Sequence, residues 1–410
     1  MIDSKGNNLI FLLSTPRSGS SLATVMLQNH RKIFAAQEMW FLMSLYDLHL
    51  APQRPYGGKE IVKQFFNGVL PYDTYIRACK SFALQTYNGL LQSSGEAEMV
   101  VDKSPRYYYV LEFLDALFPQ SKRIWLIRNP LAVISSYKKV NRHTGDRFQL
   151  KEDLLSPKFN IKMADITIGL LRYCNYFAKE NPHSYRLYYE KMVTSPQEEL
   201  LKLCGFLGIT YEEGLEKYGN FMDTSKSDLY FSMGVGDPFV GRHTEPHPDS
   251  LHIWKEVLDK EEIEMYCRVL GAELFHELGY SEELAEAERI TGVRFESKPD
   301  EELLQLRTRQ LAEAAGCRWI ENYRMSADFD QADDNLDLAE LPTGDDAVHP
   351  QVLQLQITLR SLEKRLEKSH NEQIRLRTKL DHITRKIDRA KAKIPFGNHL
   401  YQWASAYLNK

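Results

Sequence analysis

The sequence has few cysteines, no surplus of basic residues and no long hydrophobic run. Its five cysteines are scattered, with no CxxC pair and no metal-ligand spacing. This pattern excludes a disulfide framework and fits a reducing compartment. The formal net charge of −4 gives no support to bulk nucleic-acid binding. No segment reaches the roughly eighteen apolar residues of a membrane span, and the N-terminal residues show no signal-peptide pattern. We therefore expect a cytoplasmic protein that binds no nucleic acid.

What is present is typical of a globular enzyme-sized chain. Hydrophobic residues make up 43% of the sequence and charged residues 26%, which leaves ample material for a core. With 410 residues the chain exceeds one typical domain. A main domain with an appendage is therefore the starting expectation.

The stretch from Leu9 to His30 predicts an anion site. The apolar run from Leu9 to Leu13 predicts a strand. The Ser-Thr-Pro-Arg-Ser-Gly-Ser-Ser stretch after it predicts a loop, and the apolar spacing after the loop predicts a helix. Such a junction directs backbone N–H groups and the helix dipole at one point. Gly19 allows close approach of a ligand, and Arg17 adds a planar donor fork suited to phosphate or sulfate. The nucleotide P-loop, GxxxxGK[ST], is not matched, because no Lys follows Gly19.

Two later segments repeat the pattern of a buried strand followed by a polar turn. Met99 to Val101 predicts a strand that ends at Lys103-Ser104-Pro105. Ile124 to Ile127 predicts another, followed by the turn Arg128-Asn129-Pro130 and a helix with Pro at an early position. Ligands of open parallel sheets bind at this edge. We expect the three turns to meet there.

These motifs resemble those of sulfotransferases that use 3'-phosphoadenosine 5'-phosphosulfate (PAPS). TPRSGSS is similar to the 5'-phosphosulfate loop of the tyrosylprotein and carbohydrate branches, KSPRYYY to the Lys-Ser motif of the carbohydrate branch, and RNPLAVISS to the 3'-phosphate site. Tyr189-Glu190 resembles the family's YED element, whose Tyr lies near the adenine. The resemblance implies PAPS as co-substrate and the following donor-binding residues: Arg17, Ser18, Gly19, Ser20, Ser21, Leu22, Arg128, Ser136 and Tyr189.

The same resemblance implies catalytic roles for Glu38, Arg17 and Lys103. Glu38 resembles the catalytic base of the tyrosylprotein and heparan branches, and its apolar neighbours suit a general base. Arg17 and Lys103 would stabilise charge on the transferring group and the leaving phosphate. Pro105 and Arg106 stand after Ser104, where cytosolic relatives have a catalytic His. His30 remains the other candidate base.

A late segment from Gly234 to Lys255 resembles the family's Gly-rich loop that closes over the nucleotide. It lacks the Arg-Lys pair of the cytosolic form. His243, His247 and His252 fall in or beside it without a Cys or carboxylate set at ligand spacing, so we expect no metal.

The C-terminal third has its own organisation. The family resemblance covers about residues 8–280 and predicts a sulfotransferase domain over residues 1–280, and residues 281–325 form a predicted helical extension. Residues 326–350 are acidic and predict a linker. Residues 351–394 carry a sustained heptad pattern, which predicts a coiled coil roughly 60 Å long at 1.5 Å per residue. Residues 395–410 form an aromatic amphipathic tail.

The coiled coil predicts self-association and a basic surface. Ser369 and Gln373 form a polar layer within the heptads, which could set register. From Gln351 onward there are thirteen Lys or Arg against five Asp or Glu. We expect a homodimer or other oligomer through residues 351–394, with contact to an anionic surface as a further hypothesis. A single helix folded back on the domain is the alternative.

Taken together, the sequence predicts an α/β fold with a P-loop-like parallel sheet flanked by helices, followed by a C-terminal coiled coil. The implied reaction is sulfuryl transfer from PAPS to an acceptor hydroxyl on a carbohydrate, glycolipid, peptide or metabolite. A P-loop-like kinase is disfavoured by the missing Lys and the absence of a clear Mg-binding acid. A non-catalytic nucleotide-binding scaffold assembled through the coiled coil is the alternative from another class.

Overall fold

The computed structural model describes most of the chain. The residues it does not describe are 36, 51–56, 146, 220–239, 241–242, 317–318, 326–349, 394–398 and 400–410. The predicted acidic linker and amphipathic tail, and most of the predicted Gly-rich loop, lie outside the described residues.

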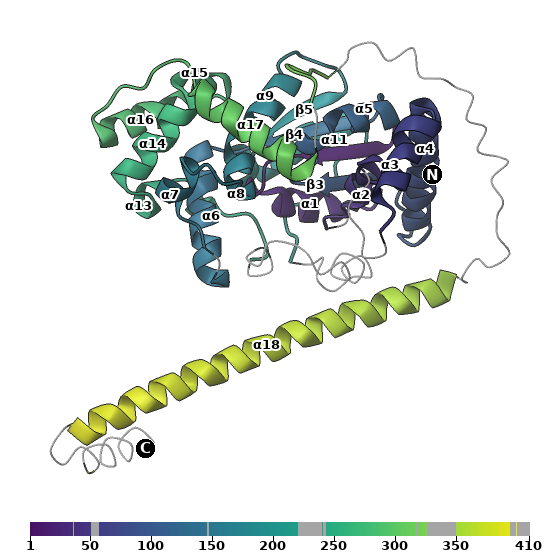
Figure 1. Ribbon diagram of the computed structural model, residues 1–410. Helices are drawn as coiled ribbons and strands as arrows, with labels where there is room; N and C mark the ends of the chain where they lie inside the picture. The colour runs from purple at the N-terminus through teal and green to yellow at the C-terminus, as the bar shows by residue number, and fades with distance from the viewer. Residues whose placement is uncertain are drawn as a thin grey trace.

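A five-stranded parallel sheet with the order β2-β3-β1-β4-β5 forms the centre of the protein (Figure 1). The strands are β1 (Leu9–Leu13), β2 (Ile33–Ala35), β3 (Met99–Ser104), β4 (Lys122–Ile127) and β5 (Ser184–Tyr188). The predicted α/β fold with a parallel sheet is confirmed.

The strands differ from the prediction in two respects. The short strand β2 was not predicted, and helices α2 to α4, over residues 41–92, lie between it and β3 in the chain. Strand β3 runs on through Lys103 and Ser104, where the sequence predicted a break. Pairing with β1 extends it, since Lys103 lies opposite Leu12 and Ser104 opposite Leu13.

The strands bury both faces because successive side chains point to opposite sides. Leu9, Phe11 and Leu13 belong to one apolar cluster, and Ile10 and Leu12 belong to another on the opposite face. This double burial is typical of a parallel sheet covered by helices on both sides.

The helices cover the two faces unequally. One face is covered by α1 (Ser20–Gln28), α10 (Tyr189–Thr194) and α11 (Pro196–Leu207). Helices that contribute to the larger cluster on the other face are α2 (Phe41–His49), α4 (Tyr72–Gln92), α5 (Leu111–Leu117), α6 (Pro130–Thr144), α7 (Leu150–Leu154), α8 (Ile161–Ala164), α9 (Leu170–Tyr176), α14 (Lys260–Leu270), α15 (Ala272–Glu277), α16 (Ser281–Thr291) and α17 (Glu301–Ala315). Helices α16 and α17 of the predicted extension thus pack into the main core.

Shorter elements complete the described structure. They are α3 (Lys59–Gln64), α13 (Trp254–Val257), the π-helical turns η1 (Phe65–Val69) and η3 (Asp165–Gly169), and the 3₁₀ turns η2 (Tyr107–Tyr109) and η6 (Pro248–Ser250). Among the described helices, none combines the length and apolar character needed to cross a membrane.

The heptad segment forms one continuous helix, α18 (Pro350–Lys393), drawn in yellow in Figure 1. Its heptad leucines and isoleucines are exposed by between 39% and 71%, and they are Leu355, Leu359, Leu362, Leu366, Leu376, Leu380, Ile383 and Ile387. The helix is as predicted, whereas the partner that a coiled coil requires stays a prediction.

Candidate functional site

The loop between β1 and α1 adopts a conformation that few residues tolerate. Gly19 has φ +99°, and Arg17, although not a glycine, has φ +72°. A Cβ at Gly19 would lie 2.4 Å from the ring of Tyr189, so any larger residue would collide. Inside the loop, the hydroxyls of Thr15 and Ser18 are 2.9 Å apart and hydrogen-bonded. The loop is therefore a fixed cradle at the start of α1, as an anion site requires.

The side chain of Arg17 points toward the predicted 3'-phosphate site. Its Nε donates to Ser136 Oγ at 3.3 Å, although the two residues are 119 positions apart in the chain. The backbone carbonyl of Arg17 also accepts a bond from the Arg128 guanidinium at 2.9 Å. Three of the predicted donor-binding residues, Arg17, Arg128 and Ser136, are thus brought into contact.

Arg128 is a buried cation whose partners are neutral. Its side chain is 7% exposed and, besides the Arg17 carbonyl, it donates to Ser250 Oγ at 3.3 Å. The guanidinium lies 4.0 Å above the ring of Tyr189. Within the described part of the chain, its Nε has no hydrogen-bond partner. Burial lowers the pKa of Arg128; Tyr189 and the carboxylate of Glu190 act against this shift, and the charge of Arg17 adds to it. An incoming anion would offset the burial and the charge of Arg17.

Tyr189 packs against Arg128, Ser250 and Gly19, and little of its ring is exposed. It is the first residue of α10, and its hydroxyl is 2.8 Å from Ser250 Oγ. With the Arg128 guanidinium over its ring and Gly19 against it, the ring is largely enclosed. Its predicted place near the adenine stays a prediction.

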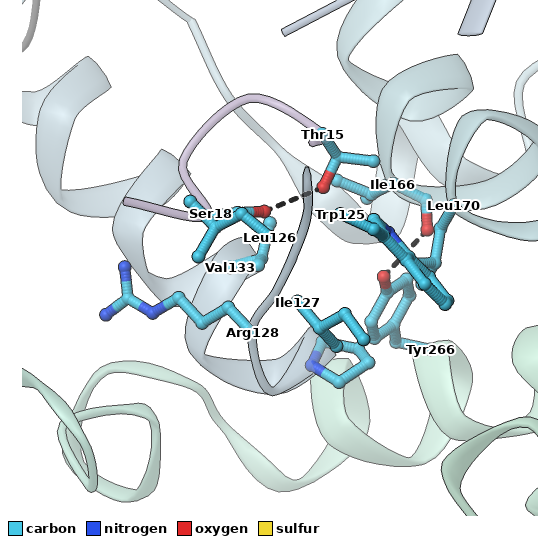
Figure 2. Close-up of a pocket in the computed structure, with 11 residues that line it drawn as sticks. Thr15, Ser18, Trp125, Leu126, Ile127, Arg128, Val133, Ile166, Leu170 and Tyr266 are labelled. Atoms are coloured by element: carbon cyan, nitrogen blue, oxygen red, sulfur yellow. Dashed lines mark hydrogen bonds between the residues drawn. The ribbon is translucent and has the colours of Figure 1, made fainter. Parts of the chain in front are cut away.

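Two cavities adjoin Arg128. The smaller, of about 10 Å³, is mostly apolar; Figure 2 shows Ile127 and Tyr266 at it, and the Arg128 side chain extending away from them. The larger has a volume of about 410 Å³. Its described lining contains no Asp or Glu, and its polar and charged members are Arg17, Ser136, Lys139, Arg128, Tyr189, Tyr218, His243, His247 and Ser250. Such a lining suits a ligand that carries several negative charges.

The predicted base and the predicted lysine form an ion pair. Lys103 Nζ donates to Glu38 Oε1 at 3.1 Å, with the lysine side chain fully buried and the glutamate 16% exposed. The other oxygen, Oε2, accepts a bond from the indole N–H of Trp40 at 3.0 Å. Glu38 therefore lies in a polar, hydrogen-bonded setting, which differs from the apolar one expected from its sequence neighbours.

Trp40 reaches Glu38 through an unusual backbone conformation. Its φ is +60°, which a bulky residue rarely adopts, and it immediately precedes α2. Strain of this kind is often found at functional sites.

His30, the alternative base, is engaged elsewhere. It is 1% exposed, its Nε2 bonds the carbonyl of Thr210 at 2.9 Å, and its Nδ1 accepts a bond from the backbone N–H of Lys32 at 3.1 Å. Both ring nitrogens thus have structural partners, and the choice of Glu38 over His30 as the base stays a prediction.

A buried polar cluster around Asp165 packs next to the site. Arg106 makes a bidentate pair with Asp165, with Nε–Oδ1 and Nη2–Oδ2 distances of 2.9 Å. The hydroxyls of Tyr108 and Tyr137 also donate to Asp165, at 2.7 and 2.9 Å. Because Tyr137 adjoins Ser136 on α6, this cluster fixes that helix against η3.

Sequence reasoning missed Trp40 and Ser250. Ser250 lies on η6, 122 positions after Arg128, and no spacing marks it. Trp40 follows the predicted base by two residues, so its nearness was visible, but its contact with Glu38 depends on the backbone turn. Among the residues described, no group of three or more His, Cys, Asp or Glu side chains is arranged to hold a metal ion.

The chain is similar to several known proteins. The chain is 26% identical over 290 residues to nodulation protein NoeE of Sinorhizobium fredii, covering 68% of this chain and 67% of that one. It is 25% identical over 206 residues to protein-tyrosine sulfotransferase A of Caenorhabditis elegans, half of each chain. A solved sulfotransferase domain, from the olefin synthase of Synechococcus PCC 7002, shares 22% identity with a TM-score of 0.42 over 63% of this chain and 92% of that domain.

The model of the sulfotransferase family matches residues 9–213, half of the chain. That range contains the loop after β1, the Glu38–Lys103 pair and Arg128. The chain therefore belongs to the sulfotransferase family.

Proposed function

We propose that this protein transfers a sulfuryl group from PAPS to the hydroxyl of an acceptor. The observation that carries this proposal is Arg128, a buried cation with neutral partners at a cavity of about 410 Å³ whose described lining has no carboxylate. Family membership supplies the reaction class.

The residues fit a nucleotide with an anionic group at each end. At the 5' end, the backbone of Ser18 to Leu22 and the start of α1 offer N–H groups, with Gly19 leaving room for close approach. At the 3' end, Arg128 and Ser136 are in reach of the same phosphate. Arg17 spans the two ends, since it belongs to the loop and bonds Ser136.

The chemistry is assigned to the Glu38–Lys103 pair. Glu38 takes the proton of the acceptor hydroxyl as its oxygen attacks the sulfur. The bond between sulfur and the bridging oxygen breaks, and 3'-phosphoadenosine 5'-phosphate (PAP) leaves with that electron pair. Lys103 and Arg17 stabilise the negative charge on the transferring group and the leaving phosphate. Lys103 can do so while it remains near Glu38, because an ammonium has three donors.

The test is transfer of label from ³⁵S-PAPS. The purified protein is incubated with the labelled donor and with one acceptor class at a time: oligosaccharides, glycolipids, tyrosine peptides and small phenols or alcohols. Labelled product that depends on the protein supports the function and identifies the acceptor. No transfer to any class, by protein that binds PAP, favours the nucleotide-binding scaffold.

We also propose that α18 joins two copies of the chain. Fully burying a leucine or isoleucine is worth about 1.5–3 kcal/mol, or about 60–120 Å² of apolar surface at 25 cal/mol per Å². Because these eight side chains are 39–71% exposed, they offer on the order of 300–600 Å² of apolar surface per helix. A stable interface buries about 800 Å² per partner, polar as well as apolar surface counted. A second copy matches this stripe because it carries the same heptads and the same polar layer.

A further inference from the structure

We propose that one face of α18 binds the surface of a lipid bilayer that contains anionic phospholipids. If the heptad stripe occupies positions a and d, this basic face consists of positions c, f and g. Its charged members are Lys364, Arg365, Lys368, Glu372, Arg375, Lys379, Arg385, Lys386 and Arg389. All of these side chains are exposed. The inference goes beyond sulfuryl transfer and does not depend on it.

The two flanks of the heptad stripe differ in charge. An α-helix turns about 100° per residue, so positions c, f and g lie on one side of the stripe and positions b and e on the other. Among the exposed residues 362–389, the basic face carries eight Lys or Arg and one Glu, a net charge of +7. The opposite flank has a net charge of −3, and its charged residues are Glu363, Glu367, Arg377, Asp381 and Asp388. The cations of this helix are thus concentrated on one side.

This concentration of cations destabilises the free helix. Arg375 and Lys379 are four residues apart on the basic face, and like charges at this spacing repel each other. Lys364 reaches Glu367 of the opposite flank at 3.2 Å, but both side chains are more than half exposed, so this ion pair contributes little. A layer of anions along the basic face would relieve the repulsion between its cations.

The dimensions of the basic face suit a surface better than a single anionic strand. The distance along the helix from Lys364 to Arg389 is about 38 Å at 1.5 Å per residue. Over that length the cations are spread across an arc of about 100°. A bilayer offers anionic groups over the whole of such an area. Clusters of about four to eight Lys or Arg on an amphipathic helix are typical of binding to anionic lipid.

The charge of the rest of the chain confines the attraction to α18. Residues 351–410 contain thirteen Lys or Arg and five Asp or Glu, which leaves 39 and 51 in residues 1–350. That larger part of the chain therefore has a net charge of −12. An anionic bilayer repels it, whereas it attracts the basic face.

Binding to lipid leaves the heptad stripe available to a second copy of the chain. In a two-stranded coiled coil, positions a and d contact the partner helix, and positions c and f lie on the outside. Substitutions in the stripe should therefore change assembly, and substitutions on the basic face should change lipid binding.

The experiment is sedimentation of the full-length protein with vesicles. One set of vesicles is phosphatidylcholine alone, and the other contains about 30% phosphatidylserine. We expect wild type to bind only the second set and to be released by about 0.5 M NaCl, because salt screens the charges. The double variant Lys379→Gln, Lys386→Gln should bind about 30-fold more weakly, since each Lys near the surface contributes about fivefold in affinity.

The matched control removes the same charge from the opposite flank. Arg377→Gln with Thr384→Glu also lowers the charge of the chain by two, at the same seven-residue spacing. Its affinity for the anionic vesicles should stay within about threefold of wild type, because these side chains lie on the other side of the stripe. Both double variants should keep the wild-type assembly state in light scattering and the wild-type affinity for PAP.

Four results would overturn the proposal. The first is that folded wild type does not bind the phosphatidylserine vesicles. The second is equal weakening by the two double variants, which would assign the effect to net charge and not to one face. The third is equal binding to both sets of vesicles, which would indicate insertion of the heptad stripe. The fourth is binding to heparin fragments without binding to vesicles, which would identify a soluble polyanion as the partner. None of these results bears on sulfuryl transfer, which the labelled donor tests separately.

Discussion

The two ends of the site contain buried cations with opposite kinds of partner. At the acceptor end, Lys103 is fully buried and 3.1 Å from the carboxylate of Glu38. At the donor end, Arg128 is 7% exposed and its hydrogen bonds in the described structure go to neutral oxygens of Arg17 and Ser250. A buried charge without a counter-charge is costly, and a buried pair is much less so.

This difference separates binding from chemistry. Under the proposed function, the donor end gains a directly bonded counter-charge from the ligand, so it should supply most of the affinity for the nucleotide. The acceptor end is internally neutral, so it should contribute little affinity and most of the rate. Variants at the two ends should therefore have separable effects.

The largest effect is expected from Glu38→Gln. The amide keeps the size and can still accept from Trp40, but it cannot take the proton of the acceptor. General-base catalysis is worth about 10²–10⁴-fold in rate. We expect kcat for transfer from labelled PAPS to fall by at least about 100-fold. Calorimetry should show PAP affinity within a few-fold of wild type. Full activity in this variant would remove Glu38 as the base.

A smaller effect is expected at Asp102, the neighbour of Lys103 on the other face of β3. Burial raises the pKa of Asp102 to about 6, although bonds from the Tyr87 and Tyr107 hydroxyls and the charge of Lys103 act against it. Because the folded pKa lies above the unfolded value, the stability that protonated Asp102 contributes is complete below about pH 4 and is lost as the pH rises through 6.

Comparison with Asp102→Asn isolates the pH-dependent contribution of Asp102 to the free energy of unfolding. The shift of about two units corresponds to ~3 kcal/mol, so the free energy of unfolding of wild type relative to the variant should fall by roughly that amount between about pH 4 and pH 7. Urea denaturation of both proteins across this range measures it. A difference that does not change with pH would contradict the assignment.

Trp40→Phe tests whether Glu38 needs the hydrogen bond from the Trp40 indole in addition to the one from Lys103. Phenylalanine keeps an aromatic ring but cannot donate to Glu38 Oε2. One hydrogen bond to a charged group is worth about 1.5–3 kcal/mol. Without it the Glu38 carboxylate is held less firmly, and we expect kcat to fall about tenfold. The affinity for PAP and the KM for the acceptor should stay near wild type. A change confined to nucleotide affinity would place Trp40 at the donor end instead.

The smallest effect on the site is expected from α18. In the full-length chain, Leu366→Lys with Leu376→Lys puts charge into the heptad stripe and should convert a dimer to a monomer in light scattering. Affinity for PAP should not change. Thr378→Lys, on the same helix but off the stripe, is the control. A wild-type monomer, or a double variant that stays dimeric, would contradict assembly through this helix.

The sequence predicted those parts that depend on local patterns. Strands β1 and β4 were found, β1 with both of its ends, because their apolar runs are followed by turns. Strand β2 was missed because three residues carry no usable periodicity. The end of β3 was misplaced because pairing with β1 extends it through Lys103.

The candidate site was predictable in composition but not in geometry. The motifs named Arg17, Glu38 and Arg128, yet no local rule shows that Arg17 turns toward Ser136 or that Ser250 meets Arg128. These are contacts between residues more than a hundred positions apart, and they are set by how the loops meet at the sheet edge. The enclosure of Tyr189 between Gly19 and Arg128 has the same origin.

The account depends most on Arg128, which we propose binds an anionic group of the donor nucleotide. Calorimetric titration of the full-length protein with PAP tests it most directly, with Arg128→Ala as the variant and Arg142→Ala, an exposed arginine of α6, as the control. We expect wild type and Arg142→Ala to bind with a dissociation constant on the order of micromolar, and Arg128→Ala to bind about 100-fold more weakly or not at all. No binding by folded wild type, or equal binding by Arg128→Ala, would contradict the account.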